Sequence, residues 1–596
     1  MREFSSPPTY VTPRSGNLTD DVVHNGTVYA DSVAFSIREH GTWSDITAAQ
    51  FLAQVRAVAK GLVAAGLEAG DRVALLSKTR YEWTLVDYAV WFAGGVTVPV
   101  YETSSAEQVE WILADSAARA VVVETALHHS VVERARKEAP TVEHVWCLDD
   151  GAVTELTDLG DDVSDEMLES RRLAVTPSSH ATVIYTSGTT GRPKGCTLSH
   201  GNFMFEVGVA VEELDELFRA EDGSTLLFLP LAHVFARVIQ VAAVRVRIRL
   251  GHSADVRHLV ADLEGFRPTF ILAVPRVFEK VFNTASQNAA ADGRSRAFDK
   301  AVETAISYSR ALDDGRPGML LRVRHAVFDR LVYSRLRAAL GGRCAYAVSG
   351  GAPLGERLGH FYRGIGVTVL EGYGLTETTA AVTVNRPDAI KVGTVGRPLG
   401  GTAVRVADDG ELEVTGGQIC EGYWRNPEAT AEVLTADGWL RTGDLAEIDD
   451  EGFVRITGRK KEILVTAGGK NVAPSTLEDR IRAHLLVDQC MVVGDGRPFI
   501  AALVTLDTDA VSLWAKNHGK PGAVQDLVED EDLRAEIQAA VDDANKAVSQ
   551  AESIRKFVVL PDAWTEEGGQ LTPSLKLRRT VVMHESRHAV DELYSR

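Results

Sequence analysis

The most informative stretch of this chain is YTSGTTGRPKGCTLSH, residues Tyr185–His200. It overlaps a hydrophobic run, Ala181–Ser187, that predicts a buried strand. The run breaks into a loop with glycines, four hydroxyl residues, and the cations Arg192 and Lys194. Glycines let backbone N–H groups approach an anion closely, and hydroxyls and lysine add donors and positive charge. This composition predicts a loop that binds polyphosphate.

The loop differs from the common P-loop of kinase-like nucleotide-binding folds. That motif needs a glycine, four residues, and then Gly-Lys-Ser/Thr. Here Lys194 follows Pro193 and precedes Gly195, so the spacing argues against a P-loop. The alternative interpretation is a surface turn rich in Gly, Thr and Pro. A lone GTTG would favour that turn, whereas the whole string favours phosphate binding.

Six further motifs follow along nearly the whole chain: PLAHVFAR (Pro230–Arg237), SGGAPL (Ser349–Leu354), EGYGLTET (Glu371–Thr378), GWLRTGDL (Gly438–Leu445), TGRKKEILVTAGGKNVAP (Thr457–Pro474) and LTPSLKLRR (Leu571–Arg579). In this order they resemble the signatures of the adenylate-forming enzymes, which include acyl-CoA synthetases, luciferases and the adenylation domains of peptide synthetases. The last two motifs, and a long helical stretch before SGGAPL, most resemble long-chain fatty acid–CoA ligases.

Composition sets limits on partners and compartment. The chain has 596 residues and a net charge of −20, which disfavours a polyanionic partner and argues against nucleic acid. Its five cysteines are scattered without CxxC spacing, as expected for reduced thiols in a cytoplasmic protein. The N-terminus lacks the apolar region of a secretory signal, and no stretch approaches the roughly 18 apolar residues of a spanning helix. Any membrane contact should therefore be peripheral, and self-association is compatible with the sequence.

Alternating apolar and helical segments predict an α/β fold with mostly parallel sheets. One set runs from Asp71 to about Leu148 around an amphipathic segment, Tyr81–Phe92. A second set has strands near 182–186, 225–229, 269–273 and 344–348, and residues 276–340 are largely helical. We expect a large N-terminal domain, 1–458, of two parallel-sheet subdomains plus a small β-subdomain at 393–456. A smaller α+β C-terminal domain, 459–596, follows, and the resemblance implies that it is mobile.

The segment VRVRIRL, Val244–Leu250, alternates strictly and predicts a strand with Arg245, Arg247 and Arg249 on one face. An edge strand protected by charge is the preferred interpretation. The alternative is an approach to anionic lipid or to a fatty acid carboxylate.

The resemblance implies a two-step reaction. A fatty acid carboxylate attacks the α-phosphorus of ATP, pyrophosphate leaves, and the acyl-AMP reacts with CoA to give acyl-CoA and AMP. Such catalysis is mainly charge neutralisation and positioning around the phosphates. ATP and Mg²⁺ are implied, with CoA as co-substrate.

The resemblance also assigns the nucleotide and metal contacts. Those on the β- and γ-phosphates are Thr186, Ser187, Gly188, Thr189, Thr190 and Lys194. Those around adenine are Gly350, Gly351, Ala352, Pro353, Gly372, Tyr373 and Gly374. Asp444 and Arg459 would hold the ribose, Thr376 the α-phosphate, and Glu377 the Mg²⁺. One carboxylate is chemically sufficient, because Mg²⁺ takes its other ligands from phosphate and water.

The resemblance also assigns residues that act or move during the reaction. Lys576 matches the lysine that bridges carboxylate and α-phosphate, although Leu575 stands where many members have glycine. His233 matches a histidine near the carboxylate that gates access; a structural histidine is the alternative. Lys461 matches the hinge, and Gly468 and Gly469 the face presented to CoA. The segment PLAHVFARVIQVAAV could line an acyl tunnel or form plain core.

Four alternative functions are considered at this point. A fatty acyl-AMP ligase would pass the acyl group to a carrier protein, but such enzymes often carry an insertion beyond the hinge that is not evident here. A CoA ligase for another carboxylic acid, or a luciferase-type oxidation, would share the motifs. A binding protein without turnover is disfavoured, because Lys576 and Glu377 are both present.

Overall fold

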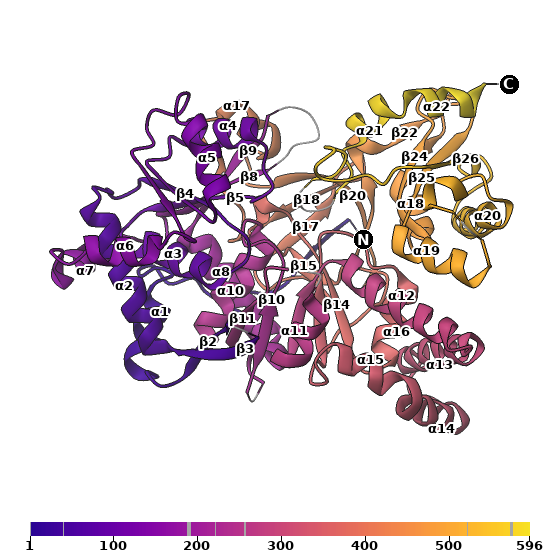
Figure 1. Ribbon diagram of the computed structural model, residues 1–596, viewed down its shortest axis with the longest axis horizontal. Coiled ribbons are helices and arrows are strands. Elements are labelled where there is room, and N and C mark those ends of the chain that lie inside the picture. Colours follow the sequence, from indigo (N-terminus) through magenta and orange to yellow (C-terminus); the bar gives the residue numbers. More distant parts are fainter. Residues whose placement is uncertain are drawn as a thin grey trace.

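A computed structural model describes residues 2–39, 41–186, 192–220, 222–255, 258–520, 522–572 and 576–595. Figure 1 shows the N-terminal elements (indigo and purple) on the left and the C-terminal elements (orange to yellow) at the upper right, with a β-rich region between them. Among the described residues, no helix is both long enough and apolar enough to cross a bilayer.

The first α/β unit is a seven-stranded sheet with the order β19-β9-β8-β5-β4-β6-β7. Its strands are β4 (Arg72–Leu76), β5 (Val96–Val100), β6 (Ala120–Val123), β7 (His144–Cys147), β8 (His180–Thr186), β9 (Lys194–Ser199) and β19 (Gly422–Tyr423). Strands β8, β5, β4, β6 and β7 pair in parallel, whereas β9 runs antiparallel to both β8 and β19. The parallel part matches the prediction.

Helix α3 (Tyr81–Phe92) corrects one expectation, because it is buried almost all round and is not amphipathic. It packs between strands β4 and β5 and the helices α2 (Ala48–Ala64) and α7 (Asp165–Ala174). Neighbours on both sides leave no solvent face. Trp83 and Trp91 are fully buried as a result.

The second unit is a nine-stranded sheet with the order β16-β15-β14-β13-β12-β10-β11-β2-β3. The six strands from β14 to β2 are parallel, and the edge strands are antiparallel. The bounds are β2 (Val33–Glu39), β3 (Thr42–Thr47), β10 (Ser224–Leu227), β11 (Arg249–His252), β12 (Phe270–Ala273), β13 (Tyr346–Ser349), β14 (Thr368–Tyr373), β15 (Thr383–Val384) and β16 (Arg397–Pro398). Two parallel-sheet units covered by helices confirm the predicted fold class.

Helices fill most of 276–340, as predicted: α12 (Pro275–Ala291), α13 (Ser295–Asp313), α14 (Met319–Phe328) and α15 (Ser334–Ala339). A π-helical turn, Asp329–Tyr333, joins the last two. Helix α13 ends at Asp313 and α14 begins at Met319, on either side of a segment that contains Gly315, Pro317 and Gly318.

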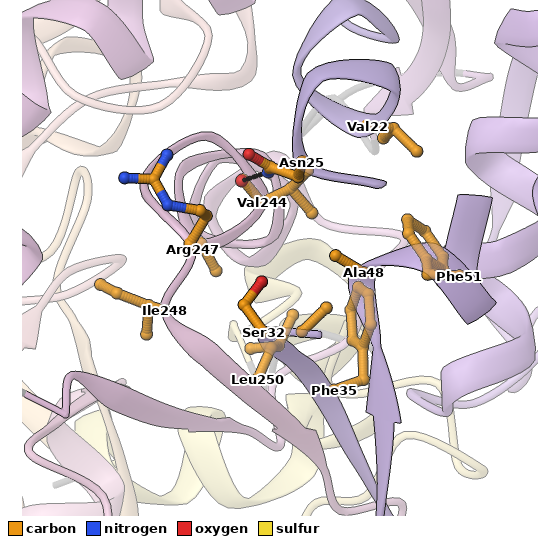
Figure 2. Close-up of a pocket in the computed structure, with 12 residues that line it drawn as sticks. Val22, Asn25, Ser32, Phe35, Ala48, Phe51, Val244, Arg247, Ile248 and Leu250 are labelled. Carbon is orange, nitrogen blue, oxygen red and sulfur yellow. Dashed lines mark hydrogen bonds between the residues drawn. The ribbon is translucent and has the colours of Figure 1, made fainter. Parts of the chain in front are cut away.

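The alternating segment at Val244–Leu250 is not one strand, so that prediction was wrong. Helix α10 (Val234–Val246) continues through Arg245, Arg247 turns the chain with a φ of 62°, and only Arg249 lies in β11. The alternation is too short to override a helix whose preceding residues are buried. Figure 2 shows that turn, where the Asn25 side chain donates to the Val244 carbonyl at 2.6 Å. The three guanidinium groups lie over separate rings: Arg245 over Tyr10, Arg247 over Tyr29 and Arg249 over Phe266.

The small β-subdomain is a five-stranded sheet with the order β1-β17-β18-β20-β21. Its strands are β1 (Glu3–Ser5), β17 (Ala403–Val406), β18 (Glu411–Thr415), β20 (Leu440–Ile448) and β21 (Val454–Arg459). The N-terminal strand β1 was not predicted; it pairs with β17 some 400 residues away.

The C-terminal region is built on a three-stranded sheet, β24 (Val487–Val493), β25 (Ile500–Leu506) and β26 (Ile554–Leu560). Around it lie α18 (Pro474–Arg482), α19 (Thr508–Asn517), α20 (Glu531–Asn545), α21 (Arg579–Glu585) and α22 (Arg587–Tyr594). This sheet has a hydrophobic core on each face. The region meets the rest of the chain where α12 contacts α19 and where Arg276 pairs with Asp488.

Candidate active site

A cavity of about 1070 Å³ lies between the sheets and the C-terminal region. Its walls come from β8, β9, α10, β14, the β-subdomain and the loop that carries Lys576. It is lined by many of the residues that the motifs predicted: Thr186, Lys194, His233, Gly350, Gly351, Gly372, Tyr373, Gly374, Thr376, Glu377, Arg459, Lys461 and Lys576. Residues more than 300 positions apart in sequence thus meet around one space.

The phosphate loop leaves and re-enters the sheet at this cavity. Strands β8 and β9 pair up to Thr186 and Lys194, where the Thr186 hydroxyl donates to the Lys194 carbonyl at 3.5 Å. The predicted contacts Ser187, Gly188, Thr189 and Thr190 lie outside the described residues. The Lys194 ammonium lies 5.3 Å from the ring centre of Tyr423, so the loop presents a cation to the cavity.

Asp444 is held in place by two donors. The Tyr373 hydroxyl donates to one carboxylate oxygen at 2.6 Å, and Arg459 Nε donates to the other at 2.9 Å. Strand pairing explains the second contact, because Asp444 and Arg459 are directly opposite in β20 and β21. Asp444 is only 4% exposed. Each oxygen has a second lone pair, so this carboxylate can still accept hydrogen bonds from a diol.

The motif EGYGLTET turns sharply after β14 and presents Thr376 and Glu377. The turn needs Gly374, since an added Cβ would lie 1.4 Å from the Ala380 carbonyl oxygen. Glu377 sits in a 3₁₀ turn, Thr376–Thr378, and its Oε1 accepts from the Tyr423 hydroxyl at 2.7 Å. Burial and this carboxylate raise the pKa of Tyr423.

The metal chemistry fits one carboxylate only. Within the described ranges, no group of three or more His, Cys, Asp and Glu side chains could hold a metal ion. Glu377 by itself suits Mg²⁺ that arrives bound to phosphate oxygens, because Mg²⁺ commonly uses one or two carboxylates plus phosphate and water.

Lys576 enters the cavity from a short loop of the C-terminal region. The loop is closed by two hydrogen bonds between Thr572 and Lys576, at 2.8 and 3.0 Å. The Lys576 side chain is open to the water of the cavity. Desolvation by the surrounding protein, and then the charge of Arg459, lower its pKa, whereas the charges of Asp444 and Glu377 act in the opposite direction. Lys576 therefore lies within electrostatic reach of the predicted ribose and metal contacts.

His233 lies at the start of α10 and faces the same space. Its Nδ1 accepts from the Phe235 backbone N–H at 3.2 Å, which caps the helix. Burial, and then the Lys576 charge, lowers the pKa of His233 to about 4. The imidazole is therefore neutral at pH 7, next to a cation.

An apolar wall continues from His233 away from the phosphate loop. It is formed by Val234, Phe235, Val238 and Ile239 of α10, and by Ala210, Leu214 and Phe218 from α8 (His200–Glu213) and the short helix after it. Glu206 of α8 also lines the cavity; it is 1% exposed, and burial raises its pKa well above the ordinary carboxyl range. The apolar side chains of this wall suit a hydrocarbon chain.

Several predicted residues are not brought into the cavity. Ala352 and Pro353 are exposed beyond Gly351, and they do not line the cavity. Gly468 and Gly469 are exposed in the loop between β22 (Leu464–Val465) and β23 (Asn471–Val472), on another face of the C-terminal region.

Sequence reasoning missed Tyr423 and the contribution of α8. Tyr423 lies in β19, directly opposite Cys196 of β9, and no motif contains it. A signal existed for α8, because His200–Glu213 follows the phosphate loop directly with apolar residues.

A second, separate space is lined by Val22, Asn25, Ser32, Phe35, Arg247 and their neighbours (Figure 2). Its volume is about 20 Å³, room for about one water molecule. It is too small for a substrate.

Family models and curated proteins of known function match this chain over most of its length. The AMP-binding enzyme model matches residues 22–424, and the model of the AMP-binding enzyme C-terminal domain matches residues 461–596. The chain is 49% identical over 601 residues to the long-chain-fatty-acid–CoA ligase FadD15 of Mycobacterium bovis, covering 100% of both chains. It is 30% identical to the long-chain-fatty-acid–CoA ligase ACSBG2 of Gallus gallus, covering 95% of this chain and 80% of that one.

Solved structures share the fold at lower identity. The A domain of the carboxylic acid reductase from Segniliparus rugosus, in complex with AMP and a co-purified carboxylic acid, has a TM-score of 0.75 at 22% identity, over 97% of this chain and 94% of that one. The o-succinylbenzoate CoA synthetase of Bacillus subtilis, in complex with ATP and magnesium, has a TM-score of 0.67 at 20% identity, over 94% and 98%. The ordered motifs, the shared cavity and the matches over the full chain agree: this chain belongs to the family of AMP-binding, adenylate-forming enzymes.

Proposed function

We propose that the protein is an ATP-dependent long-chain fatty acid–CoA ligase. The observation that carries this proposal is the shared cavity, which Glu377 and Lys576 line beside an apolar wall, together with Arg459, whose Nε donates to the buried Asp444 carboxylate just behind the lining. The full-length identity to a long-chain-fatty-acid–CoA ligase supports the substrate class. A carrier-protein acceptor is not favoured, since the relatives at 49% and 30% identity are CoA ligases.

In the first step, a carboxylate oxygen attacks the α-phosphorus of ATP and the bond to pyrophosphate breaks. Asp444 holds the ribose hydroxyls, and Arg459 and Tyr373 fix the orientation of that carboxylate. Lys576 bridges the attacking carboxylate and the α-phosphate, where negative charge concentrates. Glu377 holds the Mg²⁺ that enters with ATP, and Thr376 contacts the α-phosphate.

In the second step, the CoA sulfur attacks the acyl carbon and AMP leaves. We place the domain boundary at 458/459 and the hinge at Lys461, which lies in a 3₁₀ turn, Lys460–Glu462, directly after β21. Rotation there would withdraw Lys576 and could bring the exposed Gly468–Gly469 loop towards the site. We also propose peripheral membrane contact.

A substrate panel tests this function. Pyrophosphate release and acyl-CoA formation are measured with acetate, aromatic acids and fatty acids of increasing length. We expect the highest kcat/KM with long-chain fatty acids. Without CoA, the reaction should stop once acyl-AMP has formed and remains bound. A faster reaction with an aromatic acid would overturn the substrate class, and acyl transfer to a carrier protein in preference to CoA would overturn the acceptor.

A further inference from the structure

Helix α14 and the π-helical turn after it expose a large apolar surface. Met319 and Leu320 are each 83% exposed, Val323 and Leu331 each 59%, and Val327 52%. The helix buries none of its residues. Figure 1 shows it at a far corner of the molecule, away from the sheets and from the cavity walls. Monomeric proteins seldom expose a contiguous apolar stripe of this kind without a partner.

The stripe is held outward by contacts on the opposite side of the helix. Apolar residues recur every four positions from Met319 to Leu331, which places them on one face. On the inner face, the His325 ring stacks on Tyr308 of α13 at 3.9 Å, and its Nε2 donates to the Gly364 carbonyl at 2.6 Å. The orientation of α14 is therefore fixed by its packing.

The same segment is strongly basic in an acidic protein. Residues 315–343 carry seven arginines and one aspartate, a net charge of +6 in a chain of −20: Arg316, Arg322, Arg324, Arg330, Arg335, Arg337 and Arg343 against Asp329. Arg337 pairs with that aspartate at 2.6 Å. By contrast, Arg322, Arg330 and Arg335 form no ion pair with any described residue. Helical spacing places Arg322 and Arg330 along one border of the stripe and Arg324 along the other.

We propose that α14 docks the protein onto an anionic lipid bilayer. An apolar stripe bordered by arginines fits the boundary between headgroups and acyl chains, where arginine meets phosphate and apolar side chains enter the hydrocarbon. The positive charge of this face favours an anionic bilayer over a second copy of the chain as its partner. A second copy joined by two-fold symmetry would bring two surfaces of +6 together, whereas an anionic bilayer attracts this face and repels the net negative charge of the rest of the chain.

The location also suits the reaction, in an argument that rests on the proposed function. A long-chain fatty acid partitions strongly into a bilayer, because every CH₂ group of its chain is removed from water there. Docking through α14 would keep the ligase at the surface that holds its substrate. The docking itself needs no turnover and can be measured without it.

Vesicle co-sedimentation of the full chain tests the docking. The wild type should bind phosphatidylcholine vesicles that contain phosphatidylglycerol, and added salt should weaken this binding. Leu320→Glu with Val327→Glu should weaken it about tenfold or more, and Arg322→Glu with Arg330→Glu should remove the preference for phosphatidylglycerol. The matched control lies on α5 (Ala126–Ala135), on the other side of the molecule in Figure 1. It combines Leu127→Glu, at a residue 73% exposed, with Arg134→Glu, at an exposed arginine. This double variant should bind both kinds of vesicle as the wild type does.

Two results would overturn the proposal. One is equal binding to both kinds of vesicle, or an equal loss in the α5 control. The other is a wild-type dimer that the Leu320→Glu change dissociates, which would assign the face to a second copy. Melting temperature and acyl-CoA formation with a water-soluble acid verify folding, since these residues lie outside the cavity. Vesicle binding is read without turnover, so its failure and a failure of the ligase activity are distinguishable.

Discussion

At the scale of single residues, the proposed reaction depends on Lys576, a cation of the C-terminal region that lines the cavity. Lys576→Ala should slow acyl-AMP formation about 100-fold or more, because one charge is lost where negative charge develops. The same variant should still convert supplied acyl-AMP and CoA to acyl-CoA. Lys546→Ala, at a lysine 72% exposed, is the matched control and should leave both steps unchanged. Both half-reactions are followed by chromatography, and equal losses in both would contradict separate use of Lys576.

The pKa of His233 predicts how adenylation depends on pH. Histidine ordinarily titrates near 6.5, and here burial and Lys576 lower the pKa to about 4. The imidazole gains its proton only well below pH 6.5. Above about pH 5, then, its charge does not change, and His233→Gln should leave the shape of the kcat/KM profile between pH 5.5 and 8 as in the wild type. An acid limb centred near 6.5 that disappears in the variant would show instead that His233 titrates as a general base.

Tyr373 is predicted to act by orienting Asp444. Tyr373→Phe removes a 2.6 Å hydrogen bond from the half-buried tyrosine to that carboxylate and keeps the aromatic ring. We expect a KM for ATP raised several-fold with little change in kcat, and a loss of about 2 kcal/mol in the free energy of unfolding. Steady-state kinetics and denaturant unfolding measure these. An unchanged KM would assign the hydroxyl to stability alone.

Motif order alone singled out Glu377 and Lys576, and the structure has both lining one cavity, whereas Asp444 lies behind the lining; the roles assigned to the three residues stay predictions. Their partners were less accessible. Tyr423 reaches Glu377 only because β19 pairs with β9, which lies more than 220 residues earlier in the chain. A contact set by long-range strand pairing leaves no local pattern.

At the scale of elements, the turn Lys460–Glu462 is the proposed hinge. Lys461→Pro fixes φ at 461 and restricts Lys460, so the turn can no longer absorb a large backbone change. We expect thioester formation to slow at least about tenfold and adenylation to change little. Pre-steady-state kinetics of the two steps provides the measurement. Lys460→Ala, which removes ion pairs to Asp409 and Glu411 without stiffening the backbone, is the control. Loss of adenylation alone in the proline variant would contradict a hinge at 461.

Elements were predicted well where period and length agreed, as in the strands expected near 225–229, 269–273 and 344–348, which are β10, β12 and β13. They were predicted wrongly where local pattern and tertiary packing disagree. The alternation at Val244–Leu250 overlaps the end of a buried helix, and α3 looks amphipathic although neighbours cover it on both sides. Burial from both sides is a property of the fold, which a window of sequence does not contain.

At the scale of the whole molecule, the described arrangement brings Lys576 to the cavity, where the proposed adenylation step would use it. Arg276 of α12 helps to hold it through ion pairs with Asp488 and Asp507 of the C-terminal region. Arg276→Ala should slow adenylation several-fold and leave thioester formation from supplied acyl-AMP unchanged or faster, because it destabilises one domain arrangement only. Rapid-quench kinetics separates the steps. Slowing of the thioester step alone would contradict a role for this contact in adenylation.

The most direct test of the central claim follows one oxygen atom. Palmitate labelled with ¹⁸O in both carboxylate oxygens is turned over with ATP and CoA, and the AMP is analysed by mass spectrometry. If the carboxylate attacks the α-phosphorus and CoA then attacks the acyl carbon, each AMP molecule retains one labelled oxygen. Unlabelled AMP, or ADP with the label in inorganic phosphate, would contradict an acyl-AMP intermediate in this cavity.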